Sequence, residues 1–273
     1  MKKETEFLTY SSFFVLLFLM ISGLLDGYLQ TLVYILSFLV PPFLCLRLYF
    51  RGKKEEKMFS FDYIKIGKKE GVLTLGFVFP TVLIVFGISF LSVAFMLIFG
   101  KEQTNTVSET GIEALLIHAF LPAFLEEFAF RYVPLRIAGK RGGAGMIFLS
   151  ASLFALVHHS FFSIPYAFAA GVLFMIADLV CDSVIPSFLT HFINNVCSLF
   201  VMGALGIAVE LYTMFIILCV LSLFSLGVLF VYRKDLLSRL KGIFSEKESM
   251  SFTFEALFIC VPSFLIAILE LWG

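Results

Sequence analysis

The chain has 273 residues, of which 60% are hydrophobic and 15% charged, and its mean hydropathy is +1.01. Soluble globular domains have about 45–50% apolar and about 25% charged residues, so this composition excludes a water-soluble globule. The formal net charge is zero, so bulk charge gives no reason to expect a nucleic-acid partner. We predict an all-α, polytopic transmembrane helix bundle.

Nine apolar runs are long enough to cross the bilayer, since about 20 helical residues span about 30 Å of hydrocarbon. The first eight are predicted spans, and the ninth either spans or lies in the interface as an amphipathic helix. No linker separates them, so residues 1–273 are predicted to form a single membrane domain. The runs are residues 7–25, 28–50, 71–100, 112–138, 145–162, 165–181, 183–202, 207–232 and 252–272.

The basic residues predict the orientation. If the N-terminus is cytoplasmic, the basic loops at 51–69, 136–141 and 233–247 all lie inside, and Lys101 is the only Lys or Arg outside. This agrees with the positive-inside rule. The small size and short loops favour the plasma membrane of a prokaryote, and the lipid bilayer is the first expected partner.

The fourth run contains the sequence LPAFLEEFAFRYVP, with two acids and an arginine in an apolar setting. Ionisable groups at membrane depth are costly and by default mark a functional site. Glu127 and Arg131 are i and i+4 on a helix and are predicted to pair, whereas Glu126 lies about 100° from Glu127 and is predicted to be free. Pro122 is expected to bend the helix next to the acids.

Two later runs carry polar residues on one helix face. Phe154 and His158 are i and i+4 in the fifth run, and His191 and Asn195 are i and i+4 in the seventh. Each pair can face one cavity together with Glu126. A poorly solvated carboxylate can take a proton from water and return it to a leaving amine. His158 can hold that water. His191 and Asn195 can donate hydrogen bonds to an oxyanion.

The same residues allow other interpretations. Glu126, His158 and His191 could instead bind zinc with an open fourth position. The buried charges could belong to a membrane transporter, or the chain could be a non-catalytic immunity or partner protein. The remaining polar residues are predicted to be structural or to line the cavity; they are His118, His159, Asn194, Asp178, Asp182 and Glu210.

The predicted spans leave one inconsistency. Glu126 and His191 lie near the middle of the membrane, but His158 lies about five residues, roughly 7 Å, toward the outside. We therefore expect that the boundary of the fifth span is drawn too late, or that the helix is tilted or broken there, with a re-entrant or displaced end beside a cavity.

The three motifs, taken in order, resemble the CPBP (formerly Abi) family of intramembrane proteases. That family groups type II CAAX prenyl endopeptidases with bacteriocin-processing and self-immunity proteins. The motif-bearing core covers about residues 112–202. The matching residues are Glu126, Glu127, Arg131, Phe154, His158, His191 and Asn195.

The resemblance implies an intramembrane endopeptidase of glutamate type or metallo type. It implies that Glu126 is the general base, that His158 helps to hold the attacking water, and that His191 and Asn195 stabilise the oxyanion. Glu127, Arg131 and Phe154 are supporting residues. The implied partner is a membrane-associated peptide or protein, processed in the manner of a CAAX protein or of a bacteriocin or pheromone precursor. No cofactor is needed by the glutamate type, and zinc is the alternative.

Overall fold

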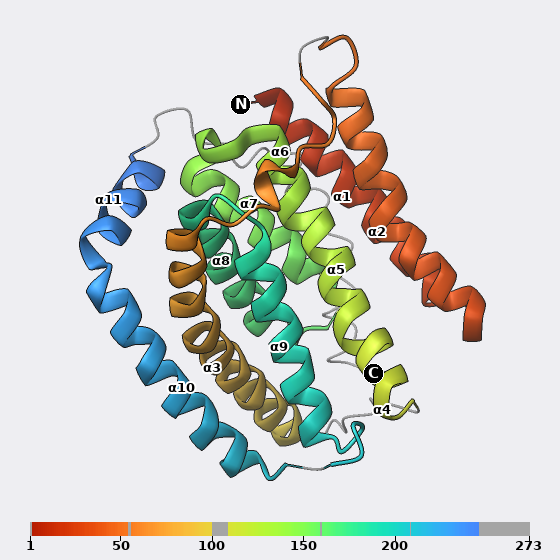
Figure 1. Cartoon of the computed structure of the whole chain (residues 1–273). Coiled ribbons are helices and arrows are strands. Elements are labelled where there is room, and N and C mark those ends of the chain that lie inside the picture. Colours follow the sequence, from red (N-terminus) through yellow and green to blue (C-terminus); the bar gives the residue numbers. More distant parts are fainter. Residues whose placement is uncertain (1, 54–55, 100–108, 159, 208, 246–273) are drawn as a thin grey trace.

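The computed structural model describes residues 2–53, 56–99, 109–158, 160–207 and 209–245 (Figure 1). Within these ranges the regular elements are all helices, so the predicted all-α class is confirmed. The elements are α1 (Lys2–Ser22), α2 (Gly27–Tyr49), η1 (Phe61–Tyr63), α3 (Lys68–Ile98), α4 (Gly111–Ala114), η2 (Leu115–Phe120), α5 (Leu121–Glu127), η3 (Phe128–Tyr132), α6 (Val133–Ala138), η4 (Gly139–Gly142), α7 (Gly143–Leu156), α8 (Ile164–Cys181), α9 (Ile185–Val201), α10 (Leu211–Val231) and α11 (Arg233–Phe244).

Five helices of the described chain are long and apolar enough to cross a membrane: α1, α2, α3, α8 and α10. The apolar helix α9 is shorter, with 17 residues, and the fourth predicted span is divided into α4, η2, α5, η3 and α6. The count of eight spans therefore stays a prediction. The ninth run, 252–272, lies outside the described residues.

Two predicted boundaries are wrong. The fifth run was expected to be helical over 145–162, but α7 ends at Leu156 and turns follow it. The segment 233–247 was expected to be a loop, but α11 occupies most of it. This helix forms because Leu236, Leu240 and Ile243 share one face and pack against the core.

Ion pairs and hydrogen bonds between side chains connect α3 with α11. Arg239 donates hydrogen bonds to the Val180 carbonyl at 2.7 Å, to Glu70 at 2.8 Å and to Asp235 at 3.0 Å. Lys69 lies 2.9 Å from Asp235. The hydrogen bond from Lys69 and the charge of Arg239 lower the pKa of Asp235 below its usual range.

The helices are arranged in packed pairs (Figure 1). α1 and α2 lie together at one edge of the bundle and α3 and α10 at the opposite edge, while α5 and α9 lie side by side between them. α7 packs closely on α8, where a Cβ atom on Gly171 would lie 2.7 Å from the Cα of Ala151. Small residues permit such a close approach of two helices, which here brings α7 and α8 together beside α9.

Candidate active site

The two acids lie between two widened turns of one continuous helical stretch. η2 and η3 are π-helical, and their closing bonds run from Leu121 N–H to the Leu116 carbonyl and from Val133 N–H to the Phe128 carbonyl. In each case a proline, Pro122 or Pro134, comes next and has no N–H to donate. The distortion expected at Pro122 thus takes the form of a π turn, a feature that is frequent at functional sites.

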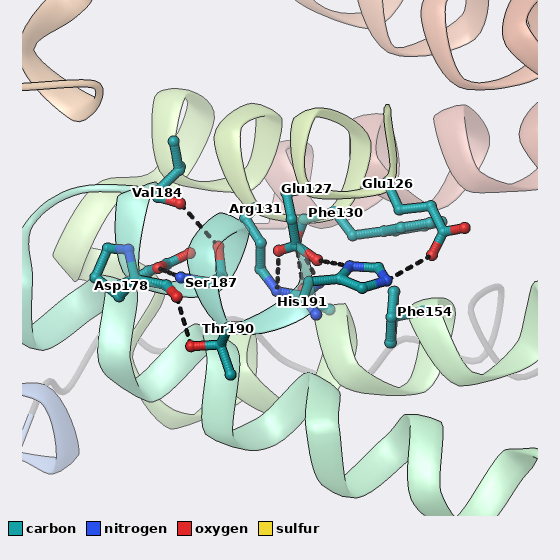
Figure 2. A network of polar contacts seen from close by, with 12 residues as sticks. Glu126, Glu127, Phe130, Arg131, Phe154, Asp178, Val184, Ser187, Thr190 and His191 are labelled. Atoms are coloured by element: carbon teal, nitrogen blue, oxygen red, sulfur yellow. Dashed lines mark hydrogen bonds and ion pairs between the residues drawn. The ribbon is translucent and has the colours of Figure 1, made fainter. Parts of the chain in front are cut away.

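Glu127 connects the helix to α9. Its Oε2 lies 3.4 Å from Nε of Arg131, so the predicted i, i+4 pair is present. Its Oε1 lies 2.8 Å from Nδ1 of His191, a contact that the sequence did not suggest (Figure 2). A carboxylate only accepts hydrogen bonds, so Nδ1 carries the hydrogen. Glu127 therefore fixes the tautomer and orientation of the His191 ring.

Glu126 contacts the other side of that ring. Its Oε2 lies 3.9 Å from Nε2 of His191, and its Oε1 accepts a 2.9 Å hydrogen bond from the Tyr34 hydroxyl. The prediction that Glu126 is free was wrong, because Tyr34 of α2 reaches it. Glu126 Oε2 is buried and makes no hydrogen bond to any described residue. The two acids thus flank one imidazole, as the close-up of the network shows (Figure 2).

Phe154 lies between the two histidines. Its ring centroid is 5.1 Å from that of His158 and 5.8 Å from that of His191. His158 follows the end of α7, and its Nδ1 lies 3.0 Å from the Phe154 carbonyl. Since a carbonyl only accepts, Nδ1 is the donor and Nε2 is left as an acceptor. His158 thus lies just beyond the end of α7 at Leu156, so the predicted boundary of the fifth span was drawn too late.

Asn195 has a less defined place. It lies one helical turn beyond His191 on α9 and is half-buried. Its side chain forms no hydrogen bond within the described chain, so the structure brings it to the same helix face as His191 without showing a contact. The backbone carbonyl of the neighbouring Asn194 accepts a hydrogen bond from the Ser198 hydroxyl.

The guanidinium of Arg131 is surrounded by aromatic rings and polar groups. It is fully buried, and its Nη1 donates to the Ser150 hydroxyl at 3.0 Å and to the Phe130 carbonyl at 3.1 Å. Its guanidinium lies 4.7 Å from the ring centroid of Phe154 and 5.7 Å from that of Phe174. A charge removed from water needs such partners. Arg131 therefore connects the motif residue Phe154 with Glu127.

The polar residues outside the three motifs form separate contacts. Asp178 of α8 is fully buried and accepts a 3.0 Å hydrogen bond from the Ser187 amide, in the first turn of α9. His118 lies 2.8 Å from Glu109, and Asp182 lies 3.3 Å from Lys140. Glu210 is the residue before α10. His159 lies outside the described residues.

An apolar groove of about 540 Å³ reaches Glu127 from between α5, α9 and the loop before α3. Two hydrogen bonds hold this loop in place, from Ser60 N–H to the Tyr132 hydroxyl at 3.0 Å and from that hydroxyl to the Ser60 carbonyl at 3.1 Å. The groove is lined by Phe59, Ser60, Phe61, Ile64, Phe120, Phe124, Glu127, Phe128, Tyr132, Val184, Ile185 and Phe188.

The possible zinc ligands are Glu126, His158 and His191. In the part of the chain that the structure describes, no three or more His, Cys, Asp or Glu side chains form a group that could hold a metal ion. Nδ1 of His191 is engaged by Glu127 and Nδ1 of His158 by a carbonyl, which leaves Nε2 of each ring as the nitrogen that could face a metal. As arranged, Glu126, His158 and His191 do not form a three-ligand site.

Comparison with known proteins agrees with the motifs. A family model described as type II CAAX prenyl endopeptidase Rce1-like matches residues 109–197, the segment that contains every motif residue from Glu126 to Asn195. No curated protein and no solved structure gives a match. With its apolar helices, the chain is an integral membrane protein. The match supports a protease, and the predicted resemblance to the CPBP family of intramembrane proteases is confirmed over residues 109–197.

Proposed function

We propose that this protein is a glutamate-type intramembrane endopeptidase that hydrolyses a peptide bond in a membrane-associated peptide or protein. One observation carries the proposal: two buried glutamates flank the His191 ring, at 2.8 Å and 3.9 Å from its two nitrogens, inside a segment that matches a protease family. Paired acids and an imidazole are the groups that general acid–base hydrolysis needs.

Glu126 takes a proton from the attacking water. Its Oε2 is buried and accepts no hydrogen bond from the described residues, so this oxygen can accept one from water. As the water oxygen bonds to the peptide carbonyl carbon, the proton moves to Glu126 and an oxyanion forms. Glu126 then gives the proton to the peptide nitrogen as the C–N bond breaks, which yields a carboxylic acid and an amine.

The two histidines have different tasks in this proposal. His158 donates through Nδ1 to the Phe154 carbonyl, so its Nε2 is an acceptor that can hold a proton of the same water. His191 donates through Nδ1 to Glu127; when its Nε2 also carries a hydrogen, that Nε2–H can donate to the oxyanion. The side-chain amide of Asn195, one turn further on α9, is the proposed second donor.

In this proposal Glu127 and Arg131 do not contact the substrate but hold the other site residues in place. Glu127 orients the His191 ring through Nδ1, as the carboxylate does in a catalytic triad. Arg131 balances the buried charge of Glu127 at 3.4 Å and packs on Phe154. Phe154 in turn contacts both histidine rings, so the supporting residues fix the distance between them.

We propose that the groove binds an apolar segment of the substrate beside the site, since its lining includes Glu127 but neither Glu126 nor a histidine. Nearly all of its lining side chains are aromatic or aliphatic, and its acidic member is Glu127. A prenylated C-terminal peptide of CAAX type or an apolar peptide precursor fits this lining. Residues 59–64 belong to a loop with the basic character of a cytoplasmic loop, so we propose that the site opens to the cytoplasm of a prokaryotic cell.

The test uses the full chain in liposomes with a fluorescence-quenched peptide, in farnesylated and unmodified forms. Glu126→Gln should lower the cleavage rate about 10²- to 10⁴-fold. Glu113→Gln is the matched control, since Glu113 is an exposed acid of α4 on the same helical stretch. Cleavage by Glu126→Gln at the rate of the control would overturn the proposal.

A further inference from the structure

The group that bonds the proposed base lies outside the family-matched segment. The hydroxyl of Tyr34 donates to Oε1 of Glu126 at 2.9 Å across a separation of 92 residues. Residues 109–197 include the other proposed site residues, but α2, which carries Tyr34, ends at Tyr49. A site drawn from the matched segment alone omits this contact.

We infer that Tyr34 is a positioning residue for Glu126. Its hydroxyl fixes one carboxylate oxygen, which leaves Oε2 directed toward the water and His191. The inference rests on the proposed function, in which Glu126 is the base.

The two oxygens of Glu126 have different surroundings. Oε1 has the Tyr34 hydroxyl, whereas Oε2 is buried, forms no hydrogen bond within the described chain and lies 3.9 Å from Nε2 of His191. The last torsion of a glutamate side chain is broad, so an unheld carboxylate samples many orientations. A hydrogen bond to an ionised carboxylate is strong and directional. The Tyr34 hydroxyl therefore determines which oxygen is available for proton transfer.

The Tyr34 ring is itself held in place. It packs edge-on against Phe38 at 5.1 Å between ring centroids, and Phe38 packs against Phe130 at 6.1 Å. Phe38 and Phe130 are both buried, and Phe130 is the residue before Arg131. The hydroxyl is thus presented from a packed contact between α2 and the helix that carries the acids.

The chemical type of the donor also fits the task. A phenol supplies one hydrogen-bond donor and stays neutral at physiological pH. A lysine or arginine at this position would form a second ion pair and compete with the proton for the carboxylate. A neutral donor orients Glu126 and leaves its charge available to take the proton from water.

The first experiment measures kcat and KM for Tyr34→Phe with the farnesylated peptide in liposomes. We expect kcat to fall about tenfold, because a hydrogen bond to a charged group is lost, while KM changes less than about twofold because the ring remains. Tyr28→Phe is the matched control on the same helix, since Tyr28 is 97% exposed. An unchanged kcat, or a raised KM with unchanged kcat, would overturn the inference.

The second experiment needs no activity. The thermal midpoint is measured for Tyr34→Phe in the wild-type chain and in a Glu126→Leu background. We expect the substitution to lower the midpoint in the first case and to have little effect in the second, since the acceptor is already gone. Equal shifts in both backgrounds would show that Tyr34 does not act through Glu126.

The two failures can be told apart. If Glu126→Gln is inactive but Tyr34→Phe behaves like Tyr28→Phe, the inference alone is wrong. If Glu126→Gln cleaves at the wild-type rate, the proposed function is wrong and the inference falls with it, while the thermal experiment still reports whether the contact exists.

Discussion

Replacement of Arg131 by Met should destabilise the fold strongly, because it leaves a buried carboxylate without its cation. Arg131 is fully buried and Glu127 nearly so, with 2% of its surface exposed. Breaking a buried pair by removing one partner costs about 3–5 kcal/mol. Here His191 still lies 2.8 Å from Glu127, so we expect the lower half of that range. At about 2–4 °C per kcal/mol for a large chain, the thermal midpoint should fall by roughly 6–16 °C.

The assay is thermal unfolding of the purified chain in detergent, with Arg51→Met as the control for loss of an exposed arginine. A double variant, Glu127→Gln with Arg131→Met, separates charge from packing. It should be more stable than Arg131→Met alone, since no unpaired charge remains buried. A midpoint for Arg131→Met within about 1 °C of the control, or a double variant with the two losses simply added, would refute the reasoning.

Three further results are expected. Phe188→Trp should raise KM for the farnesylated peptide several-fold with little change in kcat, because Phe188 lines the groove and its ring packs against Phe120 and Phe192; an unchanged KM would separate the groove from substrate binding. Exhaustive chelation should leave cleavage at wild-type rates, because Glu126 itself takes the proton; a loss reversed by zinc would favour the metallo type. Asp235→Asn should lower the thermal midpoint at pH 7, and the gap between the midpoints of variant and wild type should shrink as pH falls below 3.8, the usual pKa of the group. The reason is that a carboxyl with a lowered pKa stabilises the fold above that pH and loses the effect as it is protonated. A gap that does not change with pH would contradict this.

The local contacts of the site could be predicted from the sequence. An i, i+4 spacing on an α-helix brings two side chains to one face, and the predicted pair of Glu127 and Arg131 is present although Arg131 lies in the π turn η3. The edge-to-face contact of Phe154 with His158 is of the same kind. The approximate positions of most apolar helices could also be predicted from the length of the apolar runs, although α1 begins at Lys2, before the predicted start at residue 7.

The contacts between helices could not be predicted in this way. The approach of Tyr34 to Glu126 depends on how α2 packs against α5, and a tyrosine in an apolar run has no pattern that indicates it. The shared imidazole was missed for a related reason. Glu126 and Glu127 point about 100° apart, yet the ring of His191 is wide enough for its two nitrogens to reach one acid each.

The π turns around the acids have a consequence for comparing related sequences. A π turn is an α-helix that has gained one residue, so η2 and η3 are the two places where this helix can differ in length. Loss of one residue there would restore regular α geometry and leave the short segment from Leu121 to Glu127 intact. Alignments of the acid motif should therefore place single-residue gaps within 115–120 or 128–132, and the spacing of Glu126 from Arg131 is reliable only among sequences that keep the second of these turns.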